Sequence, residues 1–181
     1  MSVLPVHDTG TPMNAFSTPS CAPATRRAWM AVLAHTPRAE LEAALNVALA
    51  GAPEPAFDWL RPPQTGLAMV RGRIGGTGDA FNLGEATVTR ATLRLRASGT
   101  EGGDASQPGP VGVACHLGRD KRRAELAALA DALLQLPARH DRLHARLIEP
   151  LAARLAAQRD ARRADAASTR VEFFTMVRGD A

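Results

Sequence analysis

The chain has 181 residues, 45% of them hydrophobic, which suits one domain plus an extension or a long helical arm. Only 4% of its residues are aromatic, so we expect a thin core that a partner helps to bury, and the +4 charge permits anionic ligands. Two cysteines argue against a disulfide scaffold, and no apolar run approaches the roughly 20 residues of a membrane span, so we expect a cytoplasmic protein.

The first part of the chain divides into an extension and two helices. Residues 1–23 are rich in proline, serine and threonine, which interrupt every periodic pattern, so we expect a disordered N-terminal extension. Residues 24–181 are expected to form a single domain. It opens with one helix over 24–36 and a second over 37–50, and Gly51 is a natural stop for the second.

The centre of the chain predicts two strands joined by a glycine-rich loop. Residues 52–58 are expected to be a linker, and Pro62-Pro63 is expected to end any short extended piece that follows it. Side chains alternate over 67–74 and again over 85–97, which indicates a hairpin around the loop 75–79. The second strand places apolar residues on one face and mainly basic residues on the other: Ala91, Leu93 and Leu95 against Val88, Arg90, Thr92, Arg94 and Arg96.

The second half of the domain predicts one more strand followed by helices. Residues 98–110 hold many turn-forming residues and are expected to be a mobile loop. Alternation over 111–117 predicts a third strand, which suggests an antiparallel meander. An amphipathic helix is expected after Asp120, and a longer helical stretch over 139–167 should be kinked or split at Pro150.

The chain ends in the sequence RVEFFTMVRGDA, which alternates but is apolar on both faces. Such a pattern is typical of a strand covered on both sides, so residues 171–177 should lie in the sheet of this domain or under a partner. The predicted fold is therefore α+β, a single domain with an antiparallel sheet of about four strands flanked by helices.

The basic hairpin is the candidate site, and two interpretations of it stay open. Arginine side chains and glycine-rich turns can hold phosphate or phosphonate oxygens. The same arginines can instead form salt bridges to a partner subunit. The residues of this candidate contact site are Arg71, Arg73, Gly75, Gly76, Thr77, Gly78 and Arg90.

The histidines and cysteines give weaker signals. His140 and His144 are four residues apart, a spacing used by metal ligands, but the sequence HDRLH lacks the glutamate of HExxH enzymes and an obvious third ligand. Cys115 and His116 are adjacent in a predicted strand and would point to opposite faces. We therefore predict no metal site and no catalytic residue on this chain.

Four segments, taken together and in this order, resemble the PhnG family of the bacterial carbon–phosphorus lyase system. Two further segments, 1–23 and 98–110, look like departures in length and carry no family motif. The four matching segments are RRAWMAVLAHTPRAEL (26–41), TGLAMVRGRIGGTGDAFNLGEATVTRATLRL (65–95), LGRDKRRAELAALADAL (117–133) and RVEFFTMVRGD (170–180).

The resemblance implies an accessory or scaffold subunit of a core complex with PhnI, PhnH and PhnJ, assisted by PhnL. That complex attaches alkylphosphonate to the ribose of ATP with loss of adenine, giving ribose 1-alkylphosphonate 5-triphosphate. The resemblance assigns an iron–sulfur cluster and S-adenosylmethionine to PhnJ and no cofactor to this chain. With the apolar C-terminal strand placed at a partner interface, the expected contact residues are Phe173, Phe174, Met176 and Arg178.

Two other classes of function stay open on the residues alone. A stand-alone nucleic-acid-binding or anion-binding protein could use the basic strands, although aromatic residues that would stack on single-stranded bases are missing from them. A self-sufficient enzyme would have to turn over ATP and phosphonate without partners. The resemblance favours the subunit, for which we expect neither nucleic-acid nor membrane binding.

Overall fold

The computed structural model describes residues 23–50, 52–96 and 109–169. Within these ranges the fold is α+β, as predicted, and the sheet is antiparallel with strand order β1-β2-β3. The sheet has three strands in the described part of the chain, and the segment expected to supply a fourth, 170–181, lies outside it. The strands are β1 (Phe57–Arg73), β2 (Ala80–Leu95) and β3 (Val111–Leu117).

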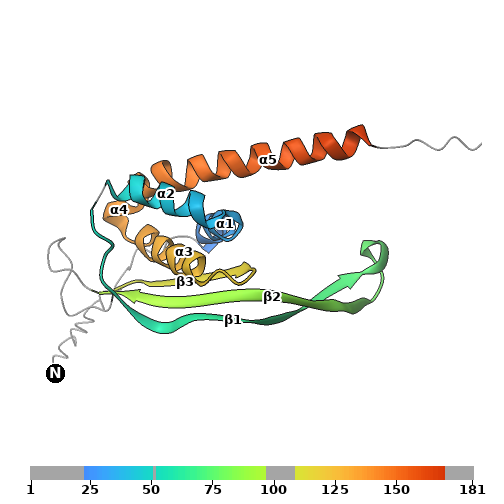
Figure 1. Ribbon diagram of the computed structural model, residues 1–181, viewed down its shortest axis with the longest axis horizontal. Helices are drawn as coiled ribbons and strands as arrows, with labels where there is room; N and C mark the ends of the chain where they lie inside the picture. The colour runs from blue at the N-terminus through green and yellow to red at the C-terminus, as the bar shows by residue number, and fades with distance from the viewer. Residues whose placement is uncertain (1–22, 51, 97–108, 170–181) are drawn as a thin grey trace, which may run out of the picture.

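All the helices lie on one face of the sheet (Figure 1). The predicted helix over 139–167 begins earlier, at Pro137, and is split, as Pro150 led us to expect. A π-helical turn, η2, precedes that proline, which sits in the first turn of the last helix where its missing N–H matters least. The helices are α1 (Pro23–His35), α2 (Arg38–Leu49), α3 (Lys121–Leu134), α4 (Pro137–Leu143), η2 (His144–Ile148) and α5 (Glu149–Ser168).

The core lies between the sheet and α3. The predicted apolar face of β2 is buried, and Asp120 caps α3 by accepting a hydrogen bond from the Arg123 amide at 3.0 Å. The predicted amphipathic pattern underestimates the burial of α3, because every residue of this helix from Leu126 to Leu134 is buried and not only one stripe of it. The sheet covers one side of α3, and α1, α2 and α4 contact the rest of it, so the helix has almost no solvent face.

Strand β1 is longer than predicted, and the linker expected over 52–58 ends where the strand begins, at Phe57. The strand also passes through Pro62-Pro63, which was expected to interrupt it. Because β1 is an edge strand, a proline there need not interrupt pairing with β2. Register shifts at Trp59/Arg61 and Arg61/Gln64 absorb the irregularity.

The distal part of the β1–β2 hairpin, residues 67–87, projects beyond the rest of the sheet and is called the arm below (Figure 1). It projects because β3 pairs with β2 only from Val88 to Arg94 and then ends. The arm carries large apolar side chains that are exposed, and Ile74 at its tip is 77% exposed. These exposed apolar residues are Leu67, Met69, Val70, Ile74, Phe81 and Leu83.

Candidate functional site

The tip of the arm brings part of the predicted contact site together. Strand β1 ends at Arg73, and a short 3-10 turn, η1 (Ile74–Gly76), follows with positive φ angles of 61° at Gly75 and 80° at Gly76. Such angles favour glycine, which explains the glycine pair. A shallow hollow of about 480 Å³ at this tip is lined by Arg71, Gly72, Arg73, Gly76 and Ala80.

Hydrogen bonds at the tip restrict its use as an anion cradle. The amides of Thr77 and Gly78 both donate to the carbonyl of Ile74, so neither is free for a ligand. Arg73 donates from Nη1 to the Gly78 carbonyl at 3.1 Å, and Arg71 donates from Nη2 to the Ala80 carbonyl at 3.4 Å. The two exposed arginines thus hold the turn, and their remaining donors have no hydrogen bond to any other described residue, which leaves these donors for a ligand or a partner.

Arg90, the third predicted arginine, is not part of this cluster. Arg71 pairs with Asn82, whereas Arg90 lies eight residues further along β2, opposite Gln64 and Cys115. At about 3.4 Å per residue, this separation is about 27 Å. Arg90 is exposed on the sheet face away from the helices, as predicted.

The other predicted residues are only partly described. His140 and His144 lie together, with ring centroids 5.8 Å apart, but their Nδ1 atoms contact the Leu134 carbonyl and Glu149 respectively. No group of three or more potential metal ligands occurs within the described ranges. The expected interface residues lie outside those ranges; they are Phe173, Phe174, Met176 and Arg178.

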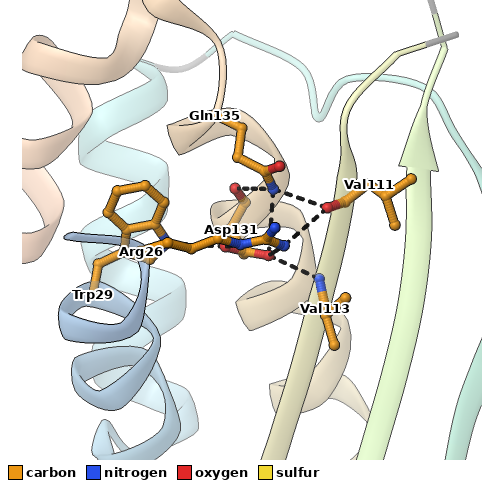
Figure 2. A network of polar contacts seen from close by, with 6 residues as sticks. All are labelled: Arg26, Trp29, Val111, Val113, Asp131 and Gln135. Atoms are coloured by element: carbon orange, nitrogen blue, oxygen red, sulfur yellow. Dashed lines mark hydrogen bonds and ion pairs between the residues drawn. The ribbon is translucent and has the colours of Figure 1, made fainter. Parts of the chain in front are cut away.

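Sequence analysis missed the buried carboxylate of Asp131, which is 0% exposed (Figure 2). It accepts hydrogen bonds from Arg26 Nη2 at 2.7 Å, Trp29 Nε1 at 2.9 Å and the Val113 amide at 2.9 Å. The network joins α1, α3 and the edge of β3 that lies opposite to β2, because the Val111 carbonyl also accepts from Arg26. The signal was present as a single acid in the alanine-leucine run of α3.

A second feature that was missed is a cavity of about 220 Å³ between α1 and β3. His116 lines it and is 5% exposed, and neither of its ring nitrogens has a hydrogen-bond partner within the described part of the chain. Burial, reinforced by the charge of Arg123 and opposed by that of Asp120, lowers the pKa of His116. The imidazole is therefore neutral at pH 7.

This histidine predicts a pH dependence of stability. Below pH 6.5, the ordinary pKa of the side chain, the unfolded chain binds a proton that folded His116 does not take up. The unfolded state then binds more protons, so the free energy of unfolding should fall as the pH drops from 7 towards 5. Urea unfolding at several pH values across this range measures the free energy of unfolding. This free energy should fall less steeply with decreasing pH for His116→Phe than for the natural chain. Equal slopes for the two proteins would contradict the assignment.

Comparison with known proteins gives two consistent findings. The family model described as phosphonate metabolism protein PhnG matches residues 24–179. A relative from Rhizobium meliloti (strain 1021), named alpha-D-ribose 1-methylphosphonate 5-triphosphate synthase subunit PhnG, is 48% identical over 157 residues. That alignment covers 87% of this chain and 91% of the relative. The chain belongs to the PhnG family.

Membership of the PhnG family confirms the resemblance drawn from the four sequence segments. The family match includes the arm, the Asp131 network and the cavity beside His116, and it extends across most of the terminal segment 170–181. None of the helices in the described ranges is long and apolar enough to cross a membrane.

Proposed function

We propose that this chain is the PhnG-type accessory subunit of a ribose 1-methylphosphonate 5-triphosphate synthase in phosphonate catabolism. The proposal rests mainly on one observation, the 48% identity to a named subunit of that synthase across 87% of the chain. In this role the chain supports transfer of alkylphosphonate to ATP with loss of adenine. The same comparison supports a hetero-oligomer and favours the subunit over a stand-alone nucleic-acid-binding protein.

The shape of the molecule supports a role in assembly. The arm presents Leu67 at 66% and Leu83 at 61% exposure, and no described helix covers the sheet face opposite to α3 (Figure 1). Large apolar side chains gathered on a projecting ribbon are typical of protein interaction sites. We propose PhnI, PhnH and PhnJ as the partners, with PhnL assisting.

The chemistry is assigned to those partners. An iron–sulfur cluster is usually held by four cysteine thiolates, whereas this chain has only Cys21 and Cys115. The residues present therefore do not fit a cluster, which we place with S-adenosylmethionine on PhnJ. The described ranges contain no nucleophile paired with a base in a catalytic arrangement, so ATP is also expected to react mainly on partner subunits.

An omission assay tests the proposal. The synthase subunits are co-expressed with and without this chain and supplied with ATP and methylphosphonate, and released adenine is measured by chromatography. We expect omission to reduce adenine release at least tenfold, because the accessory subunit completes the complex. Unchanged release without the chain would overturn the proposal.

The arginines of the arm tip give a second prediction. We expect the double variant Arg71→Ala/Arg73→Ala to lower the yield of assembled complex severalfold, because both side chains brace the exposed turn. The matched control is Arg27→Ala, an exposed arginine on α1 away from the arm. Complex yield is measured by affinity capture of a tagged partner. Normal assembly with reduced adenine release would instead support phosphate or phosphonate contact at the tip.

A further inference from the structure

The cavity between α1 and β3 is an open groove with mainly apolar walls. Met30, Ala31 and Ala34 line it from α1, and the β3 residues 113–116 line it from the sheet. Arg123 of α3 also lines it, together with His116. A groove between a helix and a strand edge is bordered by main-chain groups that an extended peptide can pair with, so it suits a peptide more than a compact solute.

The strand edge that borders this groove is only half covered. The Val113 amide donates to Asp131, and the Val111 carbonyl accepts from Arg26 and Gln135 (Figure 2). In an antiparallel strand the main-chain groups of alternate residues point to the same edge, so those of Cys115 point there too. Among the described residues, no side chain hydrogen-bonds to the main chain of Cys115, so this part of the edge can pair with another strand.

Two of the residues that line the groove have polar atoms without a hydrogen-bond partner among the described residues. Both ring nitrogens of His116 and the Nε of Arg123 are buried and have no hydrogen-bond partner within the described residues. A buried polar atom without a partner destabilises the fold until a partner is supplied. An incoming peptide with backbone carbonyl and hydroxyl groups can supply partners to both residues.

The sequence contains a segment with the required character. Residues 171–177, VEFFTMV, alternate and are apolar on both faces, as a strand packed between a helix layer and another surface would be. This segment follows α5 directly. Phe173 and Phe174 point to opposite faces of such a strand, so one of them can fill the apolar part of the groove while the other lies on the opposite face.

Helix α5 carries the start of this segment away from the groove of its own molecule (Figure 1). Arg154 of α5 contacts Glu40 at 3.9 Å, close to α1, and α5 then runs on to Ser168 with every residue from 156 onward exposed (Figure 1). The 14 residues from 155 to 168 carry the chain about 21 Å away from Arg154. Returning at about 3.3 Å per residue uses roughly six residues. The apolar segment would be largely consumed by the return path.

We propose that residues 171–177 of a second copy of this chain add to the open edge of β3 and fill the groove beneath α1. The exchange is reciprocal, so each copy of α5 delivers its terminal strand to the other. A closed symmetric pair of this kind satisfies both edges and leaves none exposed. It also explains why α5 continues as an exposed helix well beyond its last buried residue, Leu151.

Cysteine cross-linking in the assembled complex tests the exchange. Cys21→Ser leaves Cys115 of β3 as the only cysteine. One cysteine is then added on either face of the terminal strand: Phe173→Cys or Thr175→Cys on one face, Phe174→Cys or Met176→Cys on the other. After mild oxidation we expect at least one variant to give a disulfide-linked species at twice the 19.1 kDa chain mass. A cross-link within one chain, identified by mass spectrometry, would overturn the exchange. Absence of any Cys115 cross-link in all four variants, which sample both faces of the added strand, would overturn strand addition at this edge.

A charge placed in the groove gives an independent control. Ala31 is exposed and lines the groove, so Ala31→Glu should preserve the helix and lower the cross-linked fraction at least fivefold. Ala28→Glu places the same charge on an exposed position of α1 outside the groove and should leave the fraction unchanged. Equal cross-linking in both variants would contradict occupation of the groove.

Discussion

Gly112→Ala is expected to destabilise the fold by about 3 kcal/mol or more, at the upper end of the range for overpacked cores. A Cβ atom built on Gly112 would lie 1.9 Å from the Ala128 carbonyl oxygen and 2.8 Å from Ala132 Cβ. Both contacts are to α3, and the closer one is to backbone, which cannot rotate away. Urea unfolding followed by circular dichroism measures the change.

The matched control for this variant is Gly66→Ala on β1. A Cβ atom there would meet no atom within 4 Å, and its φ angle is not in the positive region. We expect a change within about 0.5 kcal/mol, as for most surface substitutions. Equal free energies of unfolding for the two variants would contradict the close packing of β3 on α3.

Asp131→Ala is expected to have a comparable effect, a loss of about 3–5 kcal/mol, the range seen when one partner of a buried ion pair is removed. The substitution leaves the Trp29 indole N–H and the Val113 amide without acceptors inside the protein. It also removes the partner of the Arg26 guanidinium, although solvent reaches that side chain and moderates this part of the loss. Thermal and urea unfolding both measure it.

An exposed ion pair provides the comparison for Asp131. Asp160 and Arg163 of α5 lie 3.5 Å apart, and both side chains are more than 70% exposed. Because exposed pairs contribute little, Asp160→Ala should change the free energy of unfolding by less than about 0.5 kcal/mol. A stable Asp131→Ala protein would show that the network in Figure 2 does not hold α1 and α3 to β3.

Local patterns in the sequence predicted most of the elements correctly. The alternation of Ala91, Leu93 and Leu95 identified the buried face of β2, and Asp120 identified the start of α3. These predictions succeeded because a strand face and a helix cap are set by residues close together in the chain. The two positive φ angles in the arm turn agree with its glycine pair for the same reason.

Features that depend on distant residues could not be predicted. The prolines of β1 are tolerated because that strand lies at an edge, a position fixed by the strand order. Arg90 is separated from Arg71 because the hairpin is long and paired in one register, which single-strand alternation does not reveal. Asp131 was overlooked because its partners, Arg26 and Trp29, are more than 100 residues away in sequence.

The central claim is that this chain is a subunit of a hetero-oligomeric synthase. Co-elution with the other synthase subunits tests that claim most directly. The chain is expressed alone and together with the PhnI-type subunit of the same organism, and both samples are separated by size-exclusion chromatography. The account predicts one stable complex that contains both proteins. The chain alone is expected to aggregate, because the arm exposes Leu67, Ile74 and Leu83. A chain that elutes as a single monomeric peak, separate from PhnI, would contradict the claim.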